Sequence, residues 1–292
     1  MIFVMYLCPK YHRDVSAAAR VGGCHRANKH YILTAPFRYT DRMSAPDETS
    51  RNLPFSGKTA LVVGGTGGTG RAVAVGLARR GADVTVHGGS SEQRLIDAVA
   101  EVRAASGKGS GFLLPVKSPS AAAEIMVKIP APDILVCAWG PFEQGDLQVH
   151  DLELWQRMTE SNLVFPAALV SLSLPHMIAR KWGRILLFGG TNTDTIRGFR
   201  TTAAYSAAKT ALGVLAKSAA KTSSGSGVTC NVLCPGLTDT EYSSTDLLRY
   251  NREKSPGGKP LEPRQIAAVA LALLENSSLN GAIVAADQGI VL

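Results

Sequence analysis

The sequence predicts an α/β fold: a single Rossmann-type doubly wound domain with a seven-stranded parallel sheet and helices on both faces. Two observations predict it. From Ser56 onward, short runs rich in Val, Ile and Leu alternate with longer Ala-rich amphipathic segments. A glycine-rich turn, Gly64 to Gly70, follows the first of these runs. Parallel strands joined by crossover helices have this alternation, and 292 residues are enough to bury the core that such a sheet needs.

Each expected strand is a short apolar run bounded by turn-forming residues. The runs are Thr59 to Val63, Asp83 to His87, Gly111 to Val116, Asp133 to Cys137, Gly183 to Phe188, Val228 to Leu233 and Ala282 to Ala286. The expected helices have apolar residues at helical spacing. They cover Gly70 to Arg80, Glu92 to Ala105, Ala121 to Lys128, Asp151 to Arg180, Ala203 to Thr222 and Pro263 to Glu275. Asp239 to Glu262 lacks periodicity, so we expect a long loop that lies on the surface or covers a substrate.

Residues 1–52 are expected to form an N-terminal extension, which leaves 53–292 as the domain. The extension has no sustained period of either 2 or 3.6 residues. We interpret it as a disordered segment or as the result of a start site assigned too early, with Met43 opening the functional polypeptide. An organelle-targeting presequence is the alternative, because Arg is frequent and acidic residues are scarce before Asp41.

Charge and composition argue against several classes of protein. The net charge is +8, but residues 1–52 carry eight Lys and Arg against four Asp and Glu, which is half of the excess. The rest of the chain is only mildly basic, so we expect no nucleic-acid partner. No apolar run approaches 18 residues, so we expect no membrane span. The five cysteines have neither CxxC nor metal-ligand spacing, which favours a reducing, cytoplasmic location and no metal site.

The turn from Val63 to Gly70 predicts a dinucleotide site. A strand that ends in a tight turn directs free backbone N–H groups, and the positive end of the next helix, toward a pyrophosphate. Glycines are needed there because a Cβ would block the turn, the approach of the phosphate, or the packing of helix on strand. The spacing Gly65-x-Gly67-x-x-Gly70 also fits long dehydrogenases, but the sequence lacks the acid after the second strand that those proteins use.

Tyr205 and Lys209 are candidate catalytic residues, because positions i and i+4 of a helix share one face. A phenol with a pKa of about 10 is a poor acid at neutral pH, and a neighbouring ammonium lowers that pKa toward the working range. Such a pair can exchange a proton with a carbonyl or hydroxyl oxygen. A surface helix pair without chemistry is the alternative interpretation.

Four motifs resemble, in order and spacing, those of the short-chain dehydrogenase/reductase family. They are the glycine turn, the Tyr205 and Lys209 pair, Asn231 with Pro235-Gly236, and the ending Gly281 to Gly289. The resemblance covers Ser56 to the C-terminus, and the ending is most like that of 3-oxoacyl-acyl-carrier-protein reductases and their relatives. It implies an NAD(P)-dependent oxidoreductase that reduces a carbonyl to an alcohol.

The resemblance also implies a role for each matching position. Tyr205 would be the general acid, while Lys209 would lower the tyrosine's pKa and bind the nicotinamide ribose. Asn162 would hold a water molecule in a proton relay. Besides Tyr205 and Lys209, the implied cofactor-binding positions are Gly64, Thr66, Gly68, Thr69, Gly70, Ala138, Gly140, Pro235, Gly236 and Thr238, with Thr240 as a further phosphate contact.

The family's catalytic serine has no counterpart in this sequence. Gly190 stands at the aligned position, and the following loop, Thr191 to Thr202, is longer than the family spacing requires. We expect Thr191 to replace the serine, with Asn192 as the second choice, since either side chain can donate a hydrogen bond to a substrate oxygen.

Two further segments depart from the family pattern. Cys137-Ala138-Trp139-Gly140 stands where the family has Asn-Asn-Ala-Gly, so Trp139 is expected near the cofactor. Val116-Lys117 stands where an acidic residue commonly contacts the adenine ring. The adenine pocket is therefore expected to differ from the family pattern.

The end of the second strand favours NADP over NAD. An NAD site usually has an acid there, which binds the ribose 2′-hydroxyl and would repel a 2′-phosphate. The residues here are His87-Gly88-Gly89-Ser90-Ser91, without a carboxylate. We expect NADP, with Ser90, Ser91 or His87 near the phosphate, and NAD as the alternative.

These observations together predict an NADP-dependent reductase of a small-molecule or acyl-carrier-bound carbonyl. Family members form dimers or tetramers through the helices that carry Asn162 and Tyr205, so we expect a homotetramer or homodimer. The rival from another class is a dinucleotide-binding regulatory or scaffold protein, which the missing serine favours. A nucleic-acid binder recruited through the basic N-terminus is a third interpretation, and it would retain DNA in a salt-dependent way.

Overall fold

The structure is a computed structural model, and it describes residues 53–290 apart from 107, 242 and 244. One seven-stranded parallel sheet has the order β3-β2-β1-β4-β5-β6-β7, which confirms the predicted fold class. The strands are β1 Thr59–Val63, β2 Asp83–Gly88, β3 Ser110–Leu113, β4 Ile134–Cys137, β5 Gly183–Phe188, β6 Val228–Pro235 and β7 Ile283–Ala286. The expected extension, residues 1–52, lies outside the described residues.

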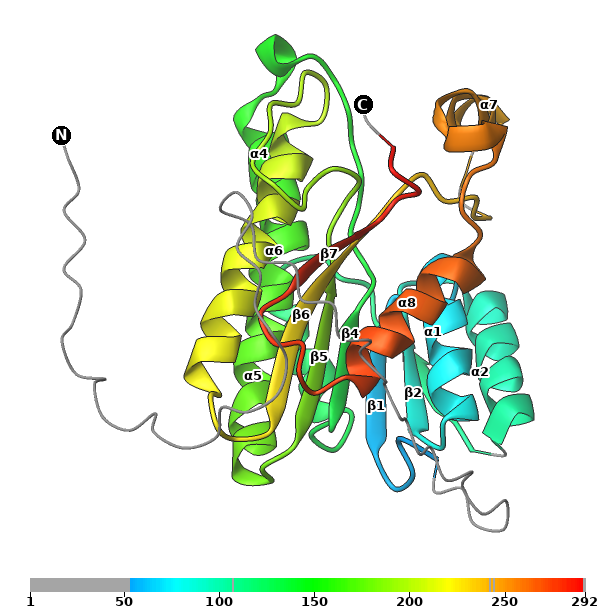
Figure 1. The fold of residues 1–292 in the computed structure, drawn as a ribbon, viewed down its shortest axis with the longest axis vertical. Helices are drawn as coiled ribbons and strands as arrows, with labels where there is room; N and C mark the ends of the chain where they lie inside the picture. The colour runs from blue at the N-terminus through cyan, green and yellow to red at the C-terminus, as the bar shows by residue number, and fades with distance from the viewer. Residues whose placement is uncertain (1–52, 107, 242, 244, 291–292) are drawn as a thin grey trace, which may run out of the picture. The chain divides into compact units, whose positions relative to one another are not determined.

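Helices cover both faces of the sheet. They are α1 Gly68–Arg79, α2 Glu92–Ser106, α3 Ala121–Val127, η1 Leu147–Val149, α4 Leu152–Thr159, the π-helical turn η2 Glu160–Val164, α5 Phe165–Ala179, α6 Ala203–Thr222, α7 Thr245–Lys254, η3 Pro256–Gly258 and α8 Pro263–Glu275. Figure 1 shows α1, α2 and α8 on one face and α4, α5 and α6 on the other. This arrangement is the predicted doubly wound one.

Alternate residues of the central strands enter two separate cores, because successive side chains of a strand point to opposite faces. In β1, Ala60 and Val62 pack into the core that α1 and α8 cover. Leu61 and Val63 pack into the core that α3, α5 and α6 cover. Since both faces are buried, these strands are apolar throughout, and this is why their boundaries are readable in the sequence.

The strand order reverses between β1 and β4, and this junction positions the site. Cys137 pairs with Val63, and the backbone N–H of Ala138 donates to the carbonyl oxygen of Val63 at 2.9 Å. The glycine turn after β1 therefore meets the segment after β4. In doubly wound sheets, ligands bind at this kind of junction, beyond the carboxyl ends of the strands.

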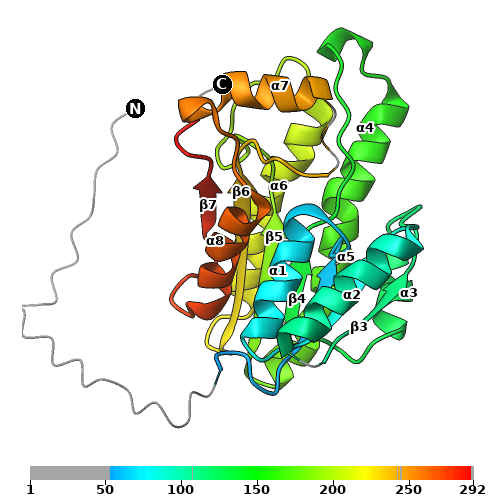
Figure 2. The same cartoon turned by 90° about the vertical axis from the view of Figure 1, so that its right-hand side faces the viewer.

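The expectation of a loop without secondary structure from Asp239 to Glu262 is wrong, because this segment contains α7. The helix has an acidic residue, Asp246, in its first turn and two basic residues, Arg252 and Lys254, in its last, which suits the helix dipole. Five of its ten residues are charged, and its apolar residues span only about one turn, which is too short to establish a helical period in the sequence. Figure 2 shows α7 beyond the carboxyl end of β7.

The helical run Leu152–Ala179 bears on the expectation that the chain has no membrane span, because this run is long and apolar. It has 28 residues and a mean hydropathy of 1.5 over an 18-residue window, so by length and composition alone it could cross a membrane. Core helices pass the same test. Phe165 and Leu169 of this run are buried against the sheet, and 39% of the window is buried in all, so the core accounts for part of its apolar composition.

Candidate active site

At the glycine turn, the backbone that follows β1 lies in close contact with the backbone that follows β4. Gly64 has a φ of 78°, which favours glycine. A Cβ on Gly64 would lie 2.9 Å from the backbone nitrogen of Trp139, and a Cβ on Gly70 would overlap the carbonyl oxygen of Gly64. Only glycine allows α1 to begin so close to β1, so the N-terminus of α1 points to the junction of the two strands.

The first amide of α1 holds an anion. Both carboxylate oxygens of Glu241 accept a hydrogen bond from the backbone nitrogen of Gly68, at 2.9 and 3.0 Å. A groove of about 490 Å³ surrounds this contact, and Arg71 and Arg94 help to line it. Sequence reasoning did not identify Glu241, because the contact joins residues 173 positions apart and no local pattern marks it.

Lys209 is buried at the carboxyl end of β5. Its Nζ donates to the carbonyl oxygen of Phe188 at 2.9 Å and lies 5.8 Å from the centre of the Tyr205 ring. The ring of Phe142 packs edge-on against that of Tyr205, with the ring centres 5.0 Å apart. The predicted pair is thus inside the site and not on an exposed helix face, and Phe142 is a neighbour that sequence reasoning missed.

Asn162 joins the same cluster from the π-helical turn η2. It is fully buried, and its Nδ2 donates to the carbonyl oxygen of Pro141 at 3.1 Å. Its Oδ1 is buried and has no hydrogen-bond partner among the residues that the structure describes. A Cβ on Gly140 would overlap this oxygen and would lie 3.1 Å from Nζ of Lys209. A π turn inserts an extra residue into a helix and often marks a functional site.

Gly190, which aligns with the family's serine, lies directly against Tyr205. A Cβ on Gly190 would lie 3.0 Å from the hydroxyl oxygen of Tyr205. The Thr191 hydroxyl donates to the carbonyl oxygen of Pro235 at 3.0 Å. Asn192 has a left-handed φ of 61° and is 5% exposed. Both expected replacements for the serine therefore stand within two residues of the position that contacts the phenol.

The pKa of Tyr205 is shifted in the direction opposite to that expected from the sequence. Burial raises the pKa of the phenol, and Cys234 adds to the rise. Burial also lowers the pKa of Lys209, to about 8. The Lys209 ammonium, which donates to the carbonyl oxygen of Phe188 and lies 5.8 Å from the centre of the ring, does not offset the burial of the phenol. The phenol is consequently protonated at neutral pH, which is the form that can donate a proton.

The predicted cofactor positions in the glycine turn and at the end of β2 differ in their exposure to solvent. Thr66 is buried within the turn, and Thr69 is half-buried in the first turn of α1. Ser90 and Ser91 are exposed just after β2. His87 is fully buried, and its Nε2 makes a 2.9 Å hydrogen bond with a backbone carbonyl in the core. The two serines therefore face solvent at the site, whereas the imidazole does not.

The predicted positions after β4 and β6 lie at the same edge of the sheet. A Cβ on Gly236 would lie 2.6 Å from the backbone of Asp287. The Thr238 hydroxyl donates to the carbonyl oxygen of Gly236 at 2.9 Å. Pro235 accepts from Thr191, as described above, and Ala138 would lie 3.2 Å from a Cβ on Gly70. The positions are thus brought to one edge by the parallel strands.

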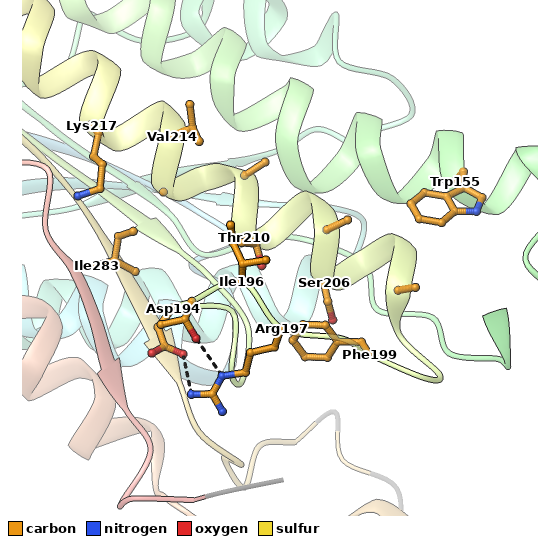
Figure 3. Close-up of a pocket in the computed structure, with 15 residues that line it drawn as sticks. Trp155, Asp194, Ile196, Arg197, Phe199, Ser206, Thr210, Val214, Lys217 and Ile283 are labelled. Carbon is orange, nitrogen blue, oxygen red and sulfur yellow. Dashed lines mark hydrogen bonds and ion pairs between the residues drawn. The ribbon is translucent and has the colours of Figure 1, made fainter. Parts of the chain in front are cut away.

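A second groove, of about 560 Å³, lies on a different face of α6 (Figure 3). Ser206, Thr210, Val214 and Lys217 line it at helical spacing, and Ile196 is 95% exposed beside it. Neither Tyr205 nor Lys209 lines it. Its lining is mostly apolar, and the chemistry of the Tyr205 cluster does not extend into it.

Comparisons with known proteins agree with this geometry. The family described as short chain dehydrogenase matches residues 58–249. The 3-oxoacyl-[acyl-carrier-protein] reductase of Escherichia coli K12 is 34% identical over 195 residues, 65% of this chain and 78% of that protein. The 2-dehydro-3-deoxy-D-gluconate 5-dehydrogenase of Pseudoalteromonas atlantica is 30% identical over 248 residues, 80% of this chain and 96% of that protein.

Solved structures show the same similarity. The crystal structure of the 3-oxoacyl (acyl-carrier-protein) reductase of Agrobacterium tumefaciens C58, with NADP bound, superposes with a TM-score of 0.75 at 27% identity. The match covers 82% of this chain and 96% of that one. A structure described as a short chain dehydrogenase/reductase family protein has a TM-score of 0.71 at 28% identity and covers 81% of this chain and 98% of its own.

From the lowered pKa of Lys209 we predict how the free energy of unfolding depends on pH. Between its pKa of about 8 in the folded chain and the ordinary value of 10.5, the unfolded chain binds more protons than the folded one. The free energy of unfolding therefore rises with pH in this window. Relative to Lys209→Met, we expect the wild type to gain about 2 kcal/mol from about pH 7.5 to about pH 9.5.

Urea unfolding of both proteins at several pH values measures this difference. Lys221→Met, which removes an exposed lysine at the end of the same helix, is the control and should follow the wild type across the window. A pH dependence that is the same in the wild type and in Lys209→Met would mean that the ammonium is not buried as described.

Proposed function

The chain belongs to the short-chain dehydrogenase family, and we propose that it reduces a carbonyl group to an alcohol with NADPH. Family membership makes it an oxidoreductase. The observation that carries the finer proposal is the cluster of Tyr205, Lys209 and Asn162 around Gly140 and Gly190, where a phenol held in its protonated form borders a buried ammonium.

The residues of the glycine turn fit a dinucleotide. Gly64 and Gly70 allow the turn after β1, the start of α1 and the end of β4 to approach closely, and the Gly68 amide at this point binds the carboxylate of Glu241, which stands in for an anionic phosphate. Of the positions proposed to hold the cofactor, Gly68 and Thr69 belong to the start of α1, where the helix dipole favours negative charge. These features support a cofactor site at the glycine turn.

The proposed chemistry divides between the cofactor and the chain. When bound, NADPH supplies a hydride to the carbonyl carbon. Tyr205 donates its phenolic proton to the carbonyl oxygen, so the product leaves as an alcohol. Lys209 holds a positive charge beside the phenol and stabilises the phenolate that remains. Asn162, whose Oδ1 is unpaired, binds a water molecule that returns a proton to this cluster.

Thr191 and Asn192 are the proposed replacements for the missing serine. Gly190 offers no side chain beside the phenol, so a donor to the substrate oxygen has to come from the next residues. Thr191 has the hydroxyl, but it must release the carbonyl of Pro235 to donate elsewhere. Asn192 follows Gly190 by two residues, its backbone has a left-handed φ, and its amide group can donate a hydrogen bond.

The end of β2 supports NADP over NAD. The segment Gly88 to Ser91 has no carboxylate to repel a 2′-phosphate. The groove at the start of α1 is lined by Arg71 and Arg94 but also by Glu101 and Glu241, so its own charges balance. The Agrobacterium reductase with the same fold contains NADP. NAD remains the alternative cofactor.

We also propose a class of substrate, an oligomeric assembly and a cellular location for this protein. Similarity to 3-oxoacyl reductases supports a 3-oxoacyl thioester or a related carbonyl compound as the substrate. Exposed apolar residues on α4, α5 and α6, namely Leu152, Leu172 and Val214, support a homodimer or homotetramer formed through these helices. We further propose a cytoplasmic enzyme whose domain begins near residue 53.

A second candidate function is a dinucleotide-binding regulatory or scaffold protein of the same fold. Gly190 favours it, because the hydroxyl that the family places beside the tyrosine is missing at this position. The two candidates differ in turnover and not in cofactor binding, so kinetic measurements separate them.

Tyr205→Phe tests the proposed acid. It removes the proton while keeping the ring that packs against Phe142, so we expect kcat to fall by about 10²- to 10⁴-fold. The assay follows NADPH absorbance with acetoacetyl-CoA and a panel of ketones. Tyr250→Phe, in α7, is the matched control and should keep wild-type turnover. Undiminished turnover in Tyr205→Phe would exclude the phenol as the acid, and cofactor binding without any wild-type turnover would favour the scaffold.

Thr191→Ala and Asn192→Ala, assayed side by side, test the replacement for the serine. Loss of a hydrogen-bond donor to the developing negative charge should lower kcat by about 10²-fold in one of the two variants. NADPH affinity, measured separately, should change little, because the donor acts on the substrate. Full activity in both variants would remove both residues from the mechanism.

A further inference from the structure

We propose that Glu241 is a built-in competitor of the cofactor's phosphate for the first amide of α1, so that removing its charge tightens NADPH binding. The inference rests on the proposed function, because it takes the glycine turn as the cofactor site. It assigns to Glu241 a role in setting cofactor affinity, separate from the chemistry at Tyr205.

The contact itself is specific. Both oxygens of the Glu241 carboxylate lie within 3.0 Å of the Gly68 backbone nitrogen. The helix supplies no anion of its own, because its first turn has no acidic residue and Gly67 has no side chain to cap it. A carboxylate at a helix N-terminus is favoured by the unpaired N–H groups and by the dipole. Glu241 therefore satisfies a group that would otherwise bind an anionic ligand.

The segment that carries Glu241 is anchored at its base. The backbone nitrogen of Asp239 donates to the carbonyl oxygen of Leu261 at 2.8 Å, and that of Leu261 donates to Leu237 at 2.8 Å. Thr238 forms a bridge with the same leucine. This pairing fixes the backbone two residues before Glu241. It therefore restricts where the Glu241 carboxylate can lie relative to α1.

The carboxylate is also able to leave. Glu241 is exposed, and its side chain has no place in either core. One amide proton cannot serve two anions at full strength, and two negative groups at the same helix end repel each other. Cofactor binding at the turn therefore requires Glu241 to release Gly68. Breaking this contact makes the net free energy of cofactor binding less favourable.

Affinity measurements without substrate test this inference. We expect Glu241→Gln to bind NADPH about threefold to tenfold more tightly than the wild type, because glutamine has the same shape but no charge. Glu253→Gln, which removes an exposed carboxylate of α7, is the matched control and should bind like the wild type. Isothermal titration calorimetry gives the dissociation constants, and inorganic pyrophosphate serves as a second probe of the same amide.

The affinities of the three proteins show whether Glu241 competes with the cofactor. Tighter binding of NADPH and pyrophosphate by Glu241→Gln alone supports the competitor. Equal affinities in all three proteins, or weaker binding by Glu241→Gln, would overturn it and leave the proposed function standing. If none of the three proteins binds NADPH, the competitor and the proposed function both fail.

Discussion

The proposed active site depends on the burial of one cation, the ammonium of Lys209. Burial of a lysine is costly, and here a hydrogen bond to the end of β5 compensates for part of the cost. That bond holds α6 against the sheet and thereby sets the position of Tyr205, one turn earlier on the same face. Gly140 has to be glycine because a side chain there would collide with Asn162 and crowd the ammonium. The π turn then brings Asn162 to the same point.

The cofactor side of the site depends on a second close approach, between backbones. Gly64, Gly70 and the backbone of Trp139 lie so near one another that the turn after β1, the start of α1 and the end of β4 act as one unit. Because β1 and β4 are neighbours, this unit stands beside the Lys209 cluster. The topology of the sheet therefore places an anion-binding amide and the proposed proton donor at one edge, although they are far apart in the sequence.

Much of this arrangement could be predicted from the sequence, for physical reasons that differ between elements. β1, β5, α6 and α8 have the predicted boundaries, because strands buried on both faces and long helices rich in Ala and Leu have clear patterns. α7 was missed because its polar composition hides it. Glu241 and Phe142 were missed because their contacts are long-range, and the pKa shift of Tyr205 was reversed because burial, which sequence spacing does not report, outweighs the nearby charge. Thr191 and Asn192 remain predictions.

The central claim is that this chain transfers a hydride to a carbonyl carbon beside Tyr205. The most direct measurement follows the hydride itself. The protein is incubated with acetoacetyl-CoA and NADPH that carries deuterium at C4 of the nicotinamide, on each face in turn, and the product is analysed by mass spectrometry. We expect deuterium on the carbinol carbon of the product with only one of the two labelled forms of NADPH. Tight NADPH binding without deuterium in any product, across the full panel of carbonyl compounds, would contradict it.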